Sequence, residues 1–315
     1  MRVQTGWGRF VASDTLLIGA QDATRRIALF GIPYDTSATL GRPGARYAPD
    51  RIRAALRWNL YRVRDGGVYD VERRQVVRFD DAAVSDHGDI FVSGHDHLAT
   101  LERARVMMRE ILSAGSFPIV LGGDHSVSLP LLQAFHEHFP GPLGIIQLDA
   151  HLDLVDENPR QGRYSGSSQM RRALEFGRFV PSRLVQVGVR GFNYPDQYDY
   201  IAQQGIQHLT AGEVHAMGGR AAAMRALELA GAGEAPVFFT LDVDCLDPAF
   251  APGTGADEPG GLTSAQVLEF VRTVAPAVQA MDIVEVNPMA DQSDVTSTLA
   301  AQFVFTAITA RLAAE

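Results

Sequence analysis

The sequence contains no lysine, a single cysteine and no apolar run that we judge long enough to cross a membrane. All 28 basic residues are arginine, which excludes Schiff-base chemistry and a phosphate-binding loop built around a lysine. Cys245 alone cannot form an intrachain disulfide, and the N-terminal segment lacks the apolar stretch of a secretory signal. We therefore expect a cytoplasmic protein with no membrane partner.

Positive charge is in deficit as well. Against the 28 arginines stand 37 acidic residues, so the formal net charge is −9. Because an acidic protein repels a phosphate backbone, we expect no nucleic-acid partner. The 315 residues can bury a sizeable core, and they show no low-complexity segment, internal repeat or obvious linker. We therefore expect one domain, residues 1–315.

Short apolar runs alternate with helical patterns along the chain. Continuous apolar runs are typical of strands that are buried on both faces of a parallel sheet. The runs span 26–35, 117–126, 143–153, 184–191, 237–247 and 281–288. Helices are predicted over 96–115, 127–139, 263–275 and 297–315, with Gly115 ending the first and Thr263 capping the third. This alternation predicts an α/β fold with a mostly parallel sheet, and 60–95 as an irregular edge segment.

Acidic and histidine side chains gather where the apolar runs end. Ligands of parallel α/β proteins bind at the carboxyl ends of the strands, and alternate residues of a strand point the same way. We therefore expect four carboxylates and two imidazoles to converge, namely His125, Asp149, His151, Asp153, Asp242 and Asp244. Glu285 also lies at the end of an apolar run.

Four aspartates at one point would not all stay ionised without compensation. Six mixed carboxylate and imidazole ligands are more than one tetrahedral zinc needs, and they are typical of two divalent ions such as Mn²⁺. Such a pair lowers the pKa of a water between them. The sequence thus predicts a binuclear hydrolase acting at an unreactive carbon or phosphorus centre.

Several motifs resemble the ureohydrolase family, which contains arginases, agmatinases and related amidinohydrolases. The metal motifs are "GGDHS" (122–126), "DAHLD" (149–153) and "LDVDCLDPAFAPGTG" (241–255). The resemblance extends over nearly the whole chain, through "GIPYD" (31–35), "GRPGARYAPDRIR" (41–53), "EPGGLT" (258–263) and "DIVEVNP" (282–288). The details are most similar to agmatinase-like members.

The resemblance implies a three-layer α/β/α fold with about eight mostly parallel strands, and two divalent ions, Mn²⁺ first, with Ni²⁺ or Co²⁺ as alternatives. It implies that a metal-bridging hydroxide attacks a guanidino compound, agmatine or a guanidino acid, to give urea and an amine. It also implies a homo-oligomer, a trimer or hexamer. The resemblance also implies a role for each ligand. Asp149 and Asp242 would bridge both ions, with His125 and Asp153 completing one site and His151 and Asp244 completing the other. Asp153 would also orient the hydroxide, and Glu285 would pair with the substrate guanidinium.

Two positions depart from the agmatinase-like pattern. In "YSGSSQMRRA" (164–173), Gly166 stands where the family usually has a histidine that shuttles protons or touches substrate. Asp257 stands where proline is usual. We expect the loops 154–172, 191–200 and 250–260 to shape the substrate pocket, with Gly166 and Ser167 at the substrate and Ser165 or Ser168 as other candidates for the missing histidine's role.

Other interpretations remain open at this point. Formimidoylglutamate-hydrolysing members also lack the loop histidine, so a formimidoylglutamase-like hydrolase is one alternative. A catalytically weak subunit of a mixed oligomer is another, and a single-metal deacetylase-like hydrolase is a third.

Several polar residues favour a structural role. We expect Asp124 to support the ligands or cap a helix, Asp247 to form a turn, and Cys245 to lie in the core. We expect Arg171 and Arg172 to lie on a solvated helix face.

Overall fold

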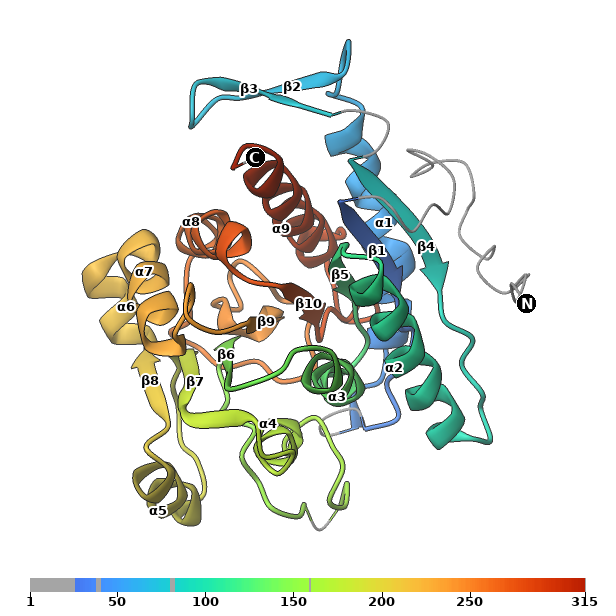
Figure 1. Cartoon of the computed structure of the whole chain (residues 1–315). Helices are drawn as coiled ribbons and strands as arrows, with labels where there is room; N and C mark the ends of the chain where they lie inside the picture. The colour runs from blue at the N-terminus through green and yellow to red at the C-terminus, as the bar shows by residue number, and fades with distance from the viewer. Residues whose placement is uncertain (1–25, 38–40, 80–82, 159, 315) are drawn as a thin grey trace.

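The computed structural model describes residues 26–37, 41–79, 83–158 and 160–314. Its centre is an eight-stranded sheet in the order β4-β1-β5-β10-β9-β6-β7-β8, in which every pairing is parallel (Figure 1). The strands are β1 (Ile27–Gly31), β4 (Val84–Asp89), β5 (Phe117–Leu121), β6 (Leu143–Leu148), β7 (Phe179–Val189), β8 (Gln207–Thr210), β9 (Val237–Asp242) and β10 (Ala280–Val284). The predicted α/β fold with about eight parallel strands is confirmed.

Helices cover both faces of this sheet, which gives three layers (Figure 1). One face packs against α1 (Ala48–Leu60), α6 (Ala211–Met217), α7 (Gly219–Ala230), α8 (Ser264–Val274) and α9 (Val295–Leu312). The other packs against α2 (His97–Ser113), α3 (Ser128–His138), α4 (Gln169–Leu174) and α5 (Pro195–Gln204).

Successive residues of the central strands enter opposite cores. In β9, Val237, Phe239 and Leu241 belong to the first core, while Phe238 belongs to the second. Both sets are buried, and this explains why each strand reads as a continuous apolar run.

The predicted helix ends agree with the structure. Thr263 and Gln266 form a reciprocal capping box at the start of α8. Gly115 follows the last turn of α2 with φ 76°, a left-handed conformation that glycine adopts without steric cost.

Two sequence-based expectations were wrong. The segment 60–95 is not irregular, since it forms the antiparallel hairpin β2 (Gly67–Asp70) and β3 (Gln75–Arg78) and then the edge strand β4. One stretch does reach the length and composition of a membrane span, namely α9. Most side chains of α9 are nevertheless buried against the sheet and its neighbouring helices, so its apolar character is explained by the core.

Candidate metal centre and cleft

The predicted site residues meet where four neighbouring central strands end. β5, β10, β9 and β6 lie side by side in that order. His125 follows β5, Glu285 follows β10, Asp242 ends β9 and Asp149 follows β6. The strand order therefore brings together segments that are far apart in the sequence.

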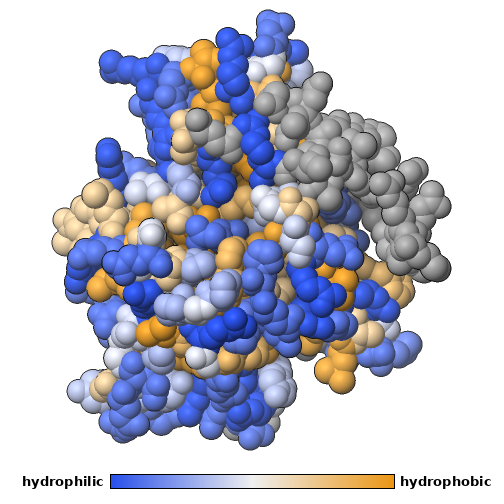
Figure 2. Space-filling view, viewed as in Figure 1, coloured by the Kyte–Doolittle hydropathy of each residue, from blue (hydrophilic) through white to orange (hydrophobic). Residues whose placement is uncertain are grey.

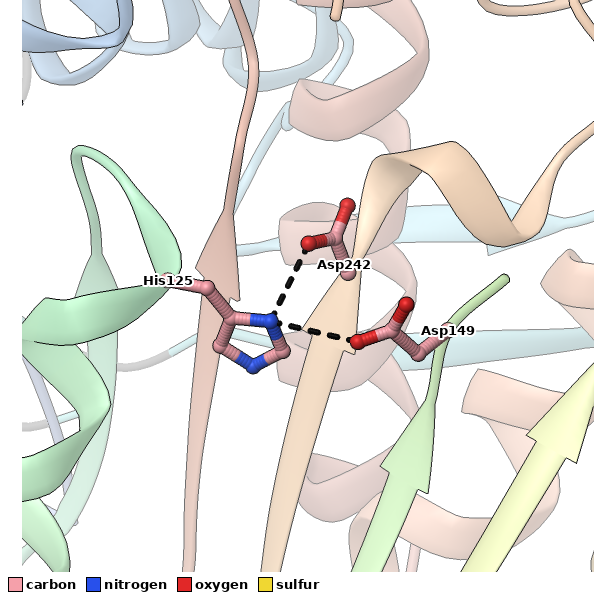
Figure 3. Close-up of side chains that lie close together, drawn as sticks. All are labelled: His125, Asp149 and Asp242. Carbon is pink, nitrogen blue, oxygen red and sulfur yellow. Dashed lines mark ion pairs between the residues drawn. The ribbon is translucent and has the colours of Figure 1, made fainter. Parts of the chain in front are cut away.

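One group of these side chains centres on the His125 imidazole (Figure 3). Its Nδ1 lies 3.2 Å from Oδ2 of Asp149, 3.0 Å from Oδ2 of Asp153 and 3.1 Å from Oδ2 of Asp242. All four side chains are buried. Figure 3 shows the ring directed between the ends of β9 and β6, toward the two aspartates drawn there.

A second group centres on His151. Its Nδ1 lies 3.0 Å from Oδ2 of Asp244 and 3.5 Å from Oδ1 of Asp149. Asp149 therefore turns one oxygen to each imidazole and belongs to both groups. The His151 side chain is 30% exposed, so the second group is open to solvent whereas the first is not.

Backbone amides fix these aspartates. The Asp242 side chain accepts a hydrogen bond from the Asp244 N–H at 2.9 Å and caps a 3-10 turn, Val243–Cys245. The Ala150 N–H donates to Asp244 Oδ1 at 3.0 Å, and the His151 N–H donates to Asp149 Oδ1 at 2.6 Å. The chain itself thus sets the orientation of the carboxylates.

Two residues of the cluster have a left-handed backbone, with φ 53° at Asp153 and φ 62° at Glu285. This conformation is unfavourable for residues other than glycine and persists where surrounding contacts enforce it. Both residues contact His125, and left-handed residues that share a partner in this way are typical of a functional centre.

Electrostatics in the cluster are dominated by burial and by like charge. Burial raises the pKa of Asp242 well above its usual range, and the Asp244 and Asp149 carboxylates add to this. Burial and the Asp149 charge raise the pKa of Asp153 to about 6. Burial opposes charge on Asp149 too, but its close contacts with the His125 and His151 imidazoles lower its pKa. Within the cluster, the imidazoles lower the pKa values of the carboxylates, whereas burial and like charge raise them.

The donor set fits divalent cations. Two ligands at right angles, each about 2.1 Å from one ion, are about 3 Å apart, which is the spacing around His125 Nδ1. That nitrogen is buried and has no partner with hydrogen-bond geometry among the described residues, although three carboxylate oxygens surround it. A cation between them would satisfy the nitrogen and the oxygens together.

Glu285 lies directly beside this cluster. Its Oε1 accepts a hydrogen bond from the His125 N–H at 2.7 Å. Burial, followed by the nearby Asp124 charge, raises the pKa of Glu285 to about 8. A cationic partner would restore its negative charge.

Gly166 lies against the same two residues. A Cβ on Gly166 would lie 3.6 Å from Glu285 Oε1 and 3.7 Å from His125 Cβ, which are ordinary contact distances. The site therefore has room for a side chain at this position.

A cleft of about 1590 Å³ leads to the cluster from the surface. Its lining includes His151, Asp153, Asp242, Asp244 and Glu285 at the cluster, and Ser165, Gly166 and Ser167 along one wall. The three loops predicted to shape the pocket all contribute to it, for example through Asn158, Phe192 and Asp257. Asp257, which departs from the family pattern, forms an ion pair of 3.0 Å with Arg42 at the rim.

The structural roles expected for other polar residues agree with the structure, with one correction. Asp124 caps a 3-10 turn by accepting from the Ser126 N–H, Asp247 accepts from three backbone N–H groups in a turn, and Cys245 is buried. The prediction for Arg171 and Arg172 was wrong. Arg172 is 1% exposed and contacts Asp156 and Glu175, and the Arg171 side chain is only 20% exposed and also contacts Asp156, so neither lies on a solvated helix face.

Arg190 was missed by the sequence-based prediction. Its guanidinium donates to the carbonyl oxygens of Asp244 at 2.7 Å, Leu246 at 3.0 Å and Glu258 at 2.5 Å. It thereby ties the loop that carries Asp244 to the rim of the cleft. No sequence signal indicates this role, because an arginine after a strand looks like any surface residue.

Comparison with known proteins gives consistent matches. A model described as the arginase family matches residues 25–310. "Agmatinase, mitochondrial" from Gallus gallus is 37% identical over 287 residues, covering 88% of this chain and 78% of that protein. Guanidinopropionase from Pseudomonas aeruginosa is 36% identical over 287 residues, covering 90% and 86%. Formiminoglutamase from Trypanosoma cruzi, solved with Mn²⁺, has a TM-score of 0.82 at 27% identity, covering 94% and 97%.

Proposed function

The chain belongs to the arginase family, and we propose that it hydrolyses a guanidino compound to urea and an amine at a centre of two divalent cations. The observation that carries this proposal is the pair of carboxylate–imidazole groups that share Asp149 at the base of a cleft, with Glu285 beside them. The names of two relatives, agmatinase and guanidinopropionase, indicate that those proteins act on agmatine and guanidinopropionate. This supports a guanidino substrate for the present chain.

The geometry supports a definite distribution of ligands. We propose that His125 and Asp153 would hold one cation and His151 and Asp244 the other, with Asp149 and Asp242 available to both. Asp149 already directs one oxygen to each imidazole. Mn²⁺ is the cation we propose, with Ni²⁺ or Co²⁺ as alternatives, and a structural neighbour solved with Mn²⁺ supports it.

Bound divalent cations supply a water of lowered pKa and hence a nucleophile at neutral pH. The chain's own residues orient the reaction. Asp153 lies at both the cluster and the cleft, where its carboxylate can accept a hydrogen bond from the attacking water. Glu285 keeps Oε1 on the His125 N–H, which leaves Oε2 to pair with the substrate guanidinium.

The wall beside Glu285 is the proposed place of the substrate chain. Gly166 provides room there, and the Ser165 and Ser167 hydroxyls, 3.0 Å apart, line the cleft next to it. We propose that Ser167 hydrogen-bonds the substrate in place of the histidine that agmatinase-like sequences carry at position 166.

The test is a panel assay on protein loaded with Mn²⁺ and separately with Ni²⁺. Agmatine, guanidinobutyrate, guanidinopropionate and formimidoylglutamate are offered, and urea, ammonia and formamide are measured. Urea from a guanidino compound supports the proposal and names the substrate. If only formimidoylglutamate reacts and formamide is released, the protein is a formimidoylglutamase-like hydrolase instead. The structural similarity to the Trypanosoma cruzi formiminoglutamase is the reason to test this alternative.

If none of the compounds is hydrolysed although two cations are bound per chain, the result favours the remaining alternative of a catalytically weak subunit in a mixed oligomer. A single bound cation with deacetylase activity would instead favour a deacetylase-like enzyme.

We further propose that residues 1–315 form one arginase-like domain, located in the cytoplasm and assembled as a homo-oligomer, a trimer or hexamer. Hydrophilic residues predominate on the face in Figure 2, with scattered hydrophobic ones. Exposed apolar side chains on α1 and the β2–β3 hairpin offer a surface for self-association: Trp58, Tyr61, Tyr69, Val71 and Val76. Light scattering after gel filtration tests the assembly, and a monomer at micromolar concentration contradicts it.

A further inference from the structure

A row of polar residues crosses the centre of the sheet directly beneath the candidate metal ligands. Gln186 of β7 pairs in register with Gln147 of β6, Gln147 with Thr240 of β9, and Thr240 with Asp282 of β10. Each of the four residues is 0% exposed. Four polar side chains in the middle of an apolar sheet are costly unless each has a partner, so their contacts show their role.

Gln147 is held with its amide nitrogen toward the ligands. The Gln186 Nε2 donates to Gln147 Oε1 at 2.7 Å, which fixes the direction of the Gln147 amide. Gln147 Nε2 then donates to Asp149 Oδ2 at 2.7 Å and approaches Asp153 Oδ2 at 3.4 Å. These two oxygens are the ones that face His125 Nδ1.

Thr240 performs a matching task for the imidazole. Its Oγ1 lies 3.0 Å from His125 Nε2. If Nδ1 faces a cation, Nε2 carries the ring proton and donates it to Thr240. The threonine hydroxyl then has its own proton to donate, and its register partner Asp282 has a buried Oδ1 with no hydrogen-bond partner among the described residues.

We propose that Gln186, Gln147, Thr240 and Asp282 form a polar row that positions the metal ligands, and this rests on the metal centre proposed above. Gln147 holds the Asp149 oxygen with a neutral donor, which adds no charge to a cluster of four carboxylates. Thr240 and Asp282 hold His125 in the tautomer that presents Nδ1. All four are positioning residues, since each acts on the reaction only through a ligand.

Paired substitutions in the full-length chain test the polar row. Thr240→Val keeps the shape but removes the hydroxyl, whereas Thr240→Ser restores it. Gln147→Met keeps the length but removes the donor. Gln279→Met is the matched control, because Gln279 accepts from the Val237 N–H at the other end of β9. The measurements are the Mn²⁺ dissociation constant by chelator competition and the Tm of the metal-free protein.

We expect Thr240→Val and Gln147→Met each to weaken Mn²⁺ binding by about 10- to 100-fold. Thr240→Ser and Gln279→Met should bind Mn²⁺ as the unmodified chain does. Unchanged affinity in Thr240→Val and Gln147→Met overturns the proposal, and so does an equal loss in Gln279→Met.

Folding failure is covered by a third substitution. If Thr240→Val or Gln147→Met does not fold, Gln186→Met decides, since it frees the Gln147 amide to turn and should also weaken Mn²⁺ binding. An unmodified chain that binds no Mn²⁺ contradicts the proposed metal centre instead of the polar row.

Discussion

Two groups of aspartates in this protein, one partly buried and one buried, are neutralised in different ways. At the sheet edge, Asp86 and Asp89 of β4 meet the guanidinium of Arg53, which is 4% exposed. Its Nε donates to Asp86 at 2.8 Å and its Nη1 to Asp89 at 2.5 Å. Although burial opposes the charge, the two carboxylates raise the pKa of Arg53. This group is complete within the chain.

The group at the centre of the sheet has no arginine that plays the part of Arg53. Four aspartates there share two imidazoles, and no arginine forms an ion pair with them among the described residues. A buried acidic cluster without its own cation is stable only if protons or metal ions balance it. A structural ion pair thus differs from a metal site in whether the chain itself supplies the cation that balances the aspartates.

The largest expected effect comes from removing a shared carboxylate. Asp149→Asn takes away a carboxylate whose two oxygens face the two imidazoles, so we expect hydrolysis of the guanidino substrate to fall by about 10⁴-fold or more. Steady-state kinetics and metal analysis measure it. Asp86→Asn is the control, because it alters the arginine-paired group, and it should keep its metal content and rate. A rate loss of equal size in both variants would erase the distinction between the two groups.

The metal cluster could be predicted from the sequence, and the arginine-paired group could not. Acidic and histidine residues at the end of an apolar strand predict a site without tertiary information. The alternation argument itself was wrong, because β6 ends at Leu148 and Asp149, His151 and Asp153 follow it outside the strand. β4, by contrast, reads "VSDHGD", which has no apolar pattern of a strand. Its structure depends on pairing with β1 and on Arg53, which is distant in the sequence.

The supporting groups around the ligands share this limit. Gln147 and Thr240 could be placed in strands from the sequence, but their register partners depend on the strand order. Arg190 contacts carbonyl oxygens of two loops, and backbone acceptors leave no trace in residue identity. Ligand types are therefore predictable here, whereas the groups that hold the ligands are not.

The next largest effect is expected from the replacement of Arg53. Arg53→Met leaves Asp86 and Asp89 without their cation, and breaking a buried pair in this way costs about 3–5 kcal/mol. Urea denaturation should show this loss in the free energy of unfolding. The folded fraction should bind Mn²⁺ normally. Stability close to that of the unmodified chain would mean that water reaches this group and screens it.

Metal removal is the counterpart at the centre of the sheet. Chelation should destabilise the protein, because a ligand that binds only the folded state contributes about 2.7 kcal/mol at a concentration of 100 times its Kd. Thermal unfolding with and without Mn²⁺ measures the difference. Asp149→Asn should lose most of it, whereas Asp86→Asn should keep it. If the Tm of the unmodified chain is the same with and without Mn²⁺, the result contradicts the proposed metal centre.

The smallest effect tests an arginine-paired aspartate whose partner is half exposed. Asp35 accepts from the Gly44 N–H at 2.7 Å and from Arg46 Nε at 2.6 Å. Burial opposes its charge, but these hydrogen bonds lower the pKa of Asp35 below its usual 3.8.

A carboxylate with a lowered pKa stabilises the folded state above its unfolded pKa and loses this contribution as the pH falls through the folded value. Asp35→Asn should therefore cost about 1–2 kcal/mol at pH 7, and the difference from the unmodified chain should shrink below about pH 4. Urea denaturation at pH 7 and pH 3 measures it, and a gap that widens at low pH would reverse the assigned sign. Because the backbone donors to Asp35 carry no net charge, the effect should persist in high salt, unlike that of an exposed ion pair.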